Sequence, residues 1–201
     1  RCHIYPGAHG MLNVSGAIQR SCNNFFYEVG YRLGSVGDSY NSERGTDMLA
    51  KYADMYGLSE TSGLEVEETD PKLSTEDAVR SSIGQGNNNY TTTQLARYVT
   101  TVANSGTCYD LTLIDRITDK NGSLLEDRSA NVRNRIEMDQ SYWDAIHTGM
   151  RGVVENMSYY GNIGVNVAGK TGTAEQSDKH PNHALFVSYA PYENPEISVT
   201  V

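Results

Sequence analysis

The sequence contains no long apolar run. Its 201 residues have a mean hydropathy of −0.53, and no stretch approaches the roughly 20 apolar residues that a membrane-spanning helix needs. It also has no starting methionine and no signal-peptide pattern. Both ends, Arg1 and Val201, look cut, so we expect a fragment of a longer protein whose anchor lies elsewhere.

Basic residues are scarce. There are only five lysines, and the formal net charge is −9. Nucleic acids are bound through a basic stripe, and acidic lipids attract basic surfaces. The composition therefore argues against nucleic acid and gives no long-range attraction to a membrane surface, so any anion site must be local.

Clusters of metal ligands are also missing from the sequence. Cys2, Cys22 and Cys108 form no C-x-x-C pair, and their odd number leaves at least one free thiol. We expect them to be small buried or half-buried side chains. His180 and His183 are separated by a proline, which disfavours a helix presenting both rings on one face. The expectation is therefore that the chain holds neither a metal nor a cofactor.

Apolar periodicity predicts a helical first part and a stranded last part. We expect a helix–loop–helix over 15–33, with Ser15 as its N-cap. Further helices are expected over 47–56, capped by Thr46, and over 91–104 and 141–155. The acidic stretch 58–90 is expected to be loop with one short helix after Ser74. A strand over 111–118 and the turn residues 119–122 predict a hairpin.

Beyond residue 163 the period changes to that of strands. The stretches 165–174, 184–189 and 197–201 alternate in polarity and are separated by polar, proline-containing loops. Helices first and strands last predict an α+β fold, with helices in about 1–160 and an antiparallel meander in about 163–201.

Near the end stands Gly164-Val-Asn-Val-Ala-Gly-Lys-Thr171, which fits the G-x-x-x-x-G-K-[ST] pattern of a phosphate-binding loop. Such a loop needs a strand before it and a helix that begins at the lysine. Here a loop precedes it, and Gly172 and Pro181 follow, so the context does not fit a nucleotide site.

A strand placement gives Lys170 a different role. Lys170 and Gly172 would point to one face and Thr171 and Thr173 to the other. A strand that offers an ammonium, hydroxyls and a bare glycine can receive an extended peptide ending in a carboxylate. Taken alone, however, Lys170-Thr171-Gly172 favours an ordinary exposed hairpin. Ser21-Cys22-Asn23, which has S-x-N form, lies about 150 residues upstream. S-x-x-K, S-D-N and K-T-G are together the motifs of the serine acyl-transfer enzymes of the β-lactamase and penicillin-binding group.

Longer segments extend this match. YPGAHG, SCNNFFYEVG, IGQG followed by TTTQLARYVTTVANSG, IHTGMRGVVE, AGKTGTAEQ and HALFVSYAP occur in this order over nearly the whole chain. The sequence thereby resembles the transpeptidase domain of a class B penicillin-binding protein.

The resemblance implies part of the β-lactamase/transpeptidase-like fold and a peptidoglycan D,D-transpeptidase that forms an acyl-enzyme. It implies stem peptides ending in D-Ala-D-Ala as substrates, β-lactams as their mimics, and a parent protein anchored at the extracytoplasmic face of the bacterial cell membrane.

The resemblance also assigns roles to residues. Ser21 would relay a proton to the leaving amine, Asn23 would bind the substrate backbone, and Lys170 would lend charge beside Ser21. Thr171 and Thr173 would bind the terminal carboxylate, Gly172 would keep the strand bare, and the Thr173 N–H would form half of the oxyanion hole.

One motif of the family is absent. No lysine of the chain has a serine three residues before it, so the 201 residues contain no S-x-x-K. The family's nucleophile lies in that motif. We therefore expect this chain alone to be inactive, its incomplete sheet to leave a strand edge open, and the fragment to self-associate through that edge.

Three other functions remain open. The first is a β-lactamase or β-lactam sensor, which rapid deacylation of the full-length protein would reveal. The second is a non-catalytic peptidoglycan-binding module, which a parent protein without S-x-x-K would favour. The third is a nucleotide-binding domain, which stabilisation by ATP would reveal.

Overall fold

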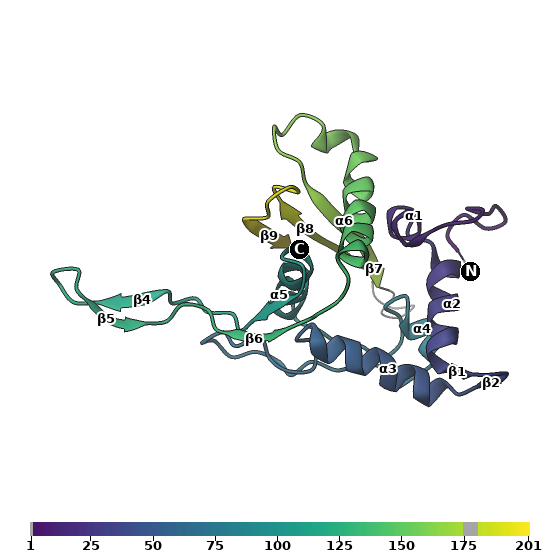
Figure 1. The fold of residues 1–201 in the computed structure, drawn as a ribbon, viewed down its shortest axis with the longest axis horizontal. Helices are drawn as coiled ribbons and strands as arrows, with labels where there is room; N and C mark the ends of the chain where they lie inside the picture. The colour runs from purple at the N-terminus through teal and green to yellow at the C-terminus, as the bar shows by residue number, and fades with distance from the viewer. Residues whose placement is uncertain (1, 175–180) are drawn as a thin grey trace.

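The structure is a computed structural model that describes residues 2–174 and 181–201 (Figure 1). The helices in it are α1 (Val14–Gln19), α2 (Asn23–Gly34), α3 (Ser42–Met55), α4 (Ala78–Ser81), α5 (Thr92–Ala103), α6 (Gln140–Glu155) and the 3-10 turn η1 (Ser158–Tyr160). The strands are β1 (Ser35–Val36), β2 (Ser39–Tyr40), β3 (Thr107–Tyr109), β4 (Arg116–Thr118), β5 (Leu124–Asp127), β6 (Val132–Arg135), β7 (Ala168–Ala174), β8 (His183–Ala190) and β9 (Ile197–Thr200). The α+β class predicted from the sequence is confirmed.

The last three strands form the antiparallel sheet β7-β8-β9, as the sequence predicts. Helices α5 and α6 pack on one of its faces. The core between them consists of buried residues from all three layers: Val99, Val102, Ala103, Met150, Ala168 and Tyr189. Because Ala168 is fully buried against the helices, the alternation of β7 places Lys170 on the helix side and Thr171 on the opposite side.

The remaining strands form small two-stranded ladders. β4 and β5 make a hairpin that projects far from the helices (Figure 1), and its turn is closed by Asp119 Oδ1, which accepts from the N–H groups of Asn121 and Ser123. The hairpin was predicted, but its first strand is shorter than expected. The Leu111 N–H donates a hydrogen bond to the Ser62 carbonyl, and the Leu113 N–H donates one to the Glu65 carboxylate. The chain before residue 116 therefore pairs with the acidic loop and not with β5. The ladder of β3 with β6 was not predicted.

Two predicted helix starts are wrong. Asn13 and not Ser15 caps α1, since its Oδ1 accepts from Gly16 N–H, while the Ser15 hydroxyl donates to the Ala145 carbonyl. Helix α3 begins five residues before the expected start, because the Asn41 side chain caps it and Thr46 lies inside. By contrast, α5 is capped by Thr91, one of the two caps that the sequence allows, Thr91 or Thr92, in a capping box.

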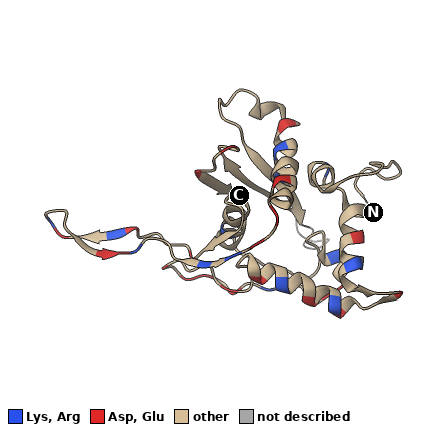
Figure 2. Ribbon diagram, viewed as in Figure 1, with Lys and Arg blue, Asp and Glu red and all other residues tan. Residues whose placement is uncertain are grey.

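Charges of both signs are interspersed along α2, α3 and the β4–β5 hairpin (Figure 2). In the part of the chain that the structure describes, no helix is long and apolar enough to cross a membrane.

Glu68 fastens the acidic loop to the start of α5. Its carboxylate accepts hydrogen bonds from the hydroxyls of Thr91 and Thr93 and from Ser62 N–H. Partial burial opposes ionisation, but these bonds outweigh it and lower the pKa of Glu68 to about 2.

We expect Glu68→Gln to lower the free energy of unfolding by about 1–2 kcal/mol at neutral pH, after allowance for solvent screening. Because the Glu68 pKa is depressed below 4.5, its contribution is present above that pH and is lost as the pH falls toward about 2. Urea unfolding of both proteins at several pH values measures this. Stability curves that stay parallel down to acid pH would contradict it. Glu67→Gln, at an exposed neighbouring carboxylate, is the control.

Candidate active site

Lys170 and Ser21 meet across 149 residues of sequence. The Lys170 ammonium donates to Ser21 Oγ at 2.9 Å and to the Thr171 carbonyl at 2.7 Å. Lys170 lies inside β7 and does not begin a helix, which contradicts the geometry of a phosphate-binding loop.

Ser21 occupies the turn between α1 and α2 in a left-handed conformation, with φ 48°. Its N–H donates to the Ile18 carbonyl, and the next N–H, of Cys22, donates to the Ala17 carbonyl. This pair of bonds is the Schellman ending of a helix, in which the left-handed position is usually a glycine. A serine there costs about 1–2 kcal/mol, so the hydroxyl is placed by a strained turn, as is frequent at functional sites.

Helix α6 sets the distance between this turn and β7. It packs on β7, with Arg151 Nη1 donating to the Val167 carbonyl at 3.0 Å. On the other side of α6, helix α1 packs against Gly149 and Gly152. A Cβ at Gly149 would meet Ile18 Cβ at 2.8 Å and the Ser15 carbonyl at 2.9 Å. The glycines thus permit the close approach of α1 that brings Ser21 to Lys170.

We therefore expect Gly149→Ala to displace α1 and to lower the free energy of unfolding by about 1–3 kcal/mol. Urea unfolding measures this change. Gly161→Ala is the matched control, since its Cβ would lie 3.5 Å from the nearest atom, the Ser158 carbonyl. Equal stability of the two variants would show that α1 does not depend on the close approach at Gly149.

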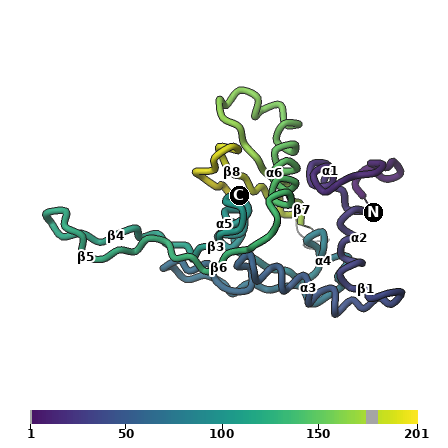
Figure 3. The backbone as a smooth tube through the Cα atoms, viewed as in Figure 1, coloured from purple at the N-terminus to yellow at the C-terminus, as the bar shows by residue number. Residues whose placement is uncertain are grey.

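A cleft of about 910 Å³ opens around these residues. Its lining includes all the sequence-predicted site residues together with side chains that the motifs did not indicate: Ser21, Asn23, Lys170, Thr171, Gly172, Thr173, His3, Phe26, Tyr27, Arg80, Ser82, Ile83, Gln85 and Tyr98. These residues come mainly from α2, α4 and β7, whose places in the fold can be followed in Figures 1 and 3. Among the described residues that line it, the charged side chains Arg80 and Lys170 are both basic, and they favour an anion locally although the whole chain is acidic.

Two features of the cleft bear on its chemistry. Burial lowers the pKa of Lys170 from its ordinary 10.5. Thr171 and Thr173 are exposed, on the face of β7 opposite to Lys170. In the sheet β8 pairs with only one side of β7, and among the described residues no strand pairs with the other. The arrangement can hold an extended peptide against a strand edge, with a proton-transferring pair at its end.

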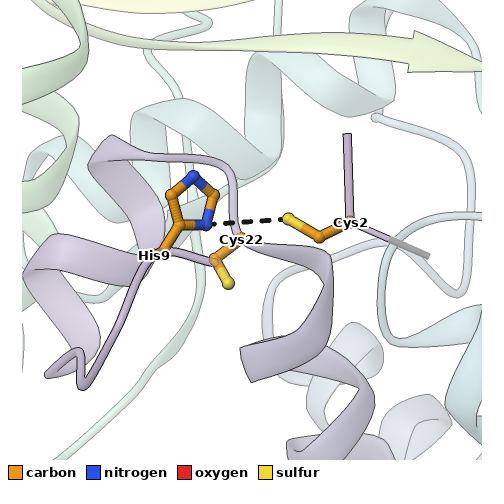
Figure 4. A group of neighbouring side chains, drawn as sticks. All are labelled: Cys2, His9 and Cys22. Carbon is orange, nitrogen blue, oxygen red and sulfur yellow. Dashed lines mark hydrogen bonds between the residues drawn. The ribbon is translucent and has the colours of Figure 1, made fainter. Parts of the chain in front are cut away.

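One group of residues that could hold a metal ion is found in the described part of the chain. It consists of Cys2, His9 and Cys22, whose ligand atoms lie within 4.8 Å of one another (Figure 4). This group was not expected, because Cys2, Cys22 and Cys108 form no C-x-x-C pair. Of the pair His180 and His183, His180 lies outside the described residues.

The chain resembles known penicillin-binding proteins in sequence and in fold. Residues 4–201 match the family described as "Penicillin binding protein transpeptidase domain". Penicillin-binding protein 2B of Streptococcus pneumoniae is 26% identical over 98% of this chain and 33% of its own length. Peptidoglycan D,D-transpeptidase MrdA of Haemophilus influenzae is 27% identical over 96% of this chain and 33% of its own.

The solved structure of penicillin-binding protein 2B from S. pneumoniae strain R6 superposes with a TM-score of 0.81, at 25% identity, covering 94% of this chain and 35% of that one. The chain thus spans about a third of the length of the curated relatives that it matches.

Proposed function

The chain belongs to the penicillin binding protein transpeptidase domain family, in its class B branch, and from this premise we propose that its Ser21–Lys170 cleft is part of the active site of a peptidoglycan D,D-transpeptidase. The observation that carries the proposal is the 2.9 Å contact between the Lys170 ammonium and Ser21 Oγ at an open strand edge. The 201 residues contain no S-x-x-K. The proposal therefore places the nucleophilic serine in a part of the full-length protein outside them.

The direction of one hydrogen bond supports a proton relay. Lys170 donates to Ser21 Oγ, which leaves the Ser21 hydroxyl proton free to point into the cleft. When the acyl bond forms, this proton passes to the leaving amine nitrogen, and the Lys170 ammonium replaces it. The lowered pKa of Lys170 eases that second transfer.

The strand edge is proposed to hold the substrate. Thr171 and Thr173 offer hydroxyls for the terminal carboxylate of a stem peptide ending in D-Ala-D-Ala, and β-lactams enter the same place. Gly172 carries no side chain where a Cβ would already meet Leu185 Cβ at 3.3 Å. The Thr173 N–H supplies one oxyanion-hole donor, and Asn23 binds the substrate backbone. We propose action at the extracytoplasmic face of a bacterial membrane, where the full-length protein is anchored.

Covalent labelling tests this function. The full-length protein is expected to take up fluorescent penicillin and to release it slowly, while the 201-residue chain alone is expected to take up none. Rapid release would indicate a β-lactamase. Slow release by a protein that does not cross-link donor peptides would indicate a β-lactam sensor. If the full-length protein is never labelled, the remaining interpretation is a non-catalytic peptidoglycan-binding module.

The 201-residue chain is further proposed to self-associate. Strand β9 lies at the edge of the sheet, and its outward residues Ile197 and Val199 are 62% and 48% exposed. Light scattering after size exclusion should show dimers or larger species that weaken in Ile197→Lys, because a charge on an edge strand opposes pairing. A monomer at all concentrations would contradict this.

A further inference from the structure

Helix α2 carries a stripe of side chains that leads out of the cleft. Asn23, Tyr27 and Tyr31 follow one another at intervals of four residues in α2, so their side chains lie on one side of the helix. Asn23 and Tyr27 line the cleft. Tyr31 lies one turn further along, and 46% of its surface is exposed. The stripe is therefore continuous with the proposed substrate site.

The ring of Tyr31 is held in place by a second aromatic residue. It stacks on Tyr40 of β2, with the ring centroids 5.0 Å apart and the planes inclined by 13°. Tyr40 in turn lies against Gly34, where a Cβ would meet the Tyr40 Cε2 atom at 2.7 Å. The glycine at the end of α2 thus lets Tyr40 support Tyr31, while much of the Tyr31 ring stays open to solvent.

The exposed stack has the chemistry of a platform for a sugar. Burial of apolar surface does not account for it, because Tyr40 is 37% exposed and Val36 of the same ladder is 56% exposed. A tyrosine held rigidly offers an apolar ring face together with a hydroxyl, which suits an amphipathic ligand. A pyranose ring is such a ligand, because its axial C–H groups form an apolar face while hydroxyl and N-acetyl groups surround its rim.

The direction of the substrate leads toward this platform. In the proposed function the terminal carboxylate lies at Thr171 and the scissile carbonyl at the Thr173 N–H. The rest of the stem peptide therefore continues past the end of β7. In Figure 1, β7 runs downward to its end near α4, and α2 runs downward from its start near α1 to the β1–β2 ladder. The peptide thus leaves the cleft toward the end of α2 that carries Tyr31.

The lengths agree as well. The eight residues from Asn23 to Tyr31 advance about 12 Å along the helix. The stem of about three residues between D-Ala-D-Ala and the sugar spans about 10 Å when it is extended. The sugar end of the donor therefore comes level with Tyr31 when its peptide backbone is held at Asn23.

We propose that Tyr31, supported by Tyr40, binds an N-acetylated sugar of the glycan strand from which the donor stem peptide extends, and that Tyr27 lines the path between. This rests on the proposed function, since it places the stem peptide in the Ser21–Lys170 cleft. The C–H face of the sugar lies on the Tyr31 ring, and the Tyr31 hydroxyl bonds to the sugar rim. The site favours donors on a glycan strand over free peptides, and β-lactams, which carry no sugar, do not use it.

The choice between two donors tests the proposal. The full-length protein is given a glycan-linked stem peptide or the same peptide without its sugars, and kcat/KM of cross-linking is measured for each. The unmutated protein is expected to prefer the glycan-linked donor at least about 10-fold. Tyr31→Ala should reduce this preference to about 2-fold, and Tyr31→Phe should keep most of it because the ring remains. Tyr142→Ala is the matched control, since Tyr142 is also an exposed helical tyrosine but lies in α6, and it should keep the full preference.

Competition gives a second measurement that needs no variant. Peptide-free chains of the same amino sugars should inhibit cross-linking of the glycan-linked donor and leave that of the sugar-free donor unchanged. Equal use of the two donors by the unmutated protein, or equal preferences in Tyr31→Ala and Tyr142→Ala, would overturn the glycan site. Equal preferences together with a loss of stability in Tyr31→Ala would assign the stack to a contact with another part of the full-length protein.

Penicillin labelling separates this proposal from the one on which it rests. If the full-length protein takes up penicillin but shows no preference between the donors, the glycan site is wrong and the transpeptidase function stands. If the protein neither takes up penicillin nor cross-links either donor, both proposals are wrong.

Discussion

Lys170→Ala is expected to lower the rate at which the full-length protein is acylated by fluorescent penicillin about 100- to 1,000-fold. Among the described residues that line the cleft, the substitution removes the single lysine, which is also the donor to Ser21 Oγ. It also leaves the substrate carboxylate without a nearby ammonium. The remaining rate reflects the oxyanion-hole donors and peptide binding along β7, which the variant retains.

Lys120→Ala is the control for this variant, because Lys120 lies in the exposed turn of the β4–β5 hairpin. Its acylation rate should equal that of the unmutated protein. If Lys170→Ala is labelled as fast as Lys120→Ala, Lys170 has no part in the site and the proposed relay is wrong.

The pH dependence of the acylation rate is a second test of the role of Lys170. Because burial lowers the pKa of Lys170 below 10.5, the ammonium is lost at a lower pH than in a free lysine. Acylation that depends on the ammonium is complete well below that pKa and falls as the pH rises through it. In Lys170→Arg any remaining activity should keep its rate to higher pH, because a guanidinium stays protonated.

Substitution of Ser21 by glycine is the second change with a large expected effect. Stability and acylation should move in opposite directions in this variant. Ser21→Gly removes the hydroxyl and also the strain of the left-handed turn. We expect acylation to fall about 100-fold while the free energy of unfolding rises by up to about 1 kcal/mol. Ser21→Ala should lose as much activity without becoming more stable, because alanine is also strained at φ 48°.

A matched position is available on α5. Ser105 has φ 58°, and the N–H groups of Ser105 and Gly106 close α5 with the same pair of bonds that closes α1. Ser105→Gly should therefore gain similar stability with no change in acylation. Thermal unfolding and β-lactam kinetics on the three variants and the unmutated protein decide the matter. A Ser21→Gly protein with normal acylation would remove the hydroxyl from the mechanism.

Local patterns were enough to predict some elements and not others. The Thr91 cap and the apolar face of α5 carry a strong local signal, and so does the turn at 119–122 of the hairpin. The start of α3 was misplaced because Asn41 stands in a stretch rich in glycine and serine that reads as loop. The β3–β6 ladder was missed because its two short strands have no apolar alternation and pair across the whole hairpin arm.

The sequence by itself determined the family and the α+β class, and it predicted Ser21, Asn23 and the Lys170–Thr173 segment as one set of site residues. These depend on residue types and on their order along the chain, which need no coordinates. Only the tertiary structure decided that the Lys170 ammonium reaches Ser21 Oγ, because that distance is set by α6, whose glycines bring α1 close to β7. It alone also brought Cys2 and His9 to Cys22, since the turn between α1 and α2 folds the N-terminal segment back onto the start of α2.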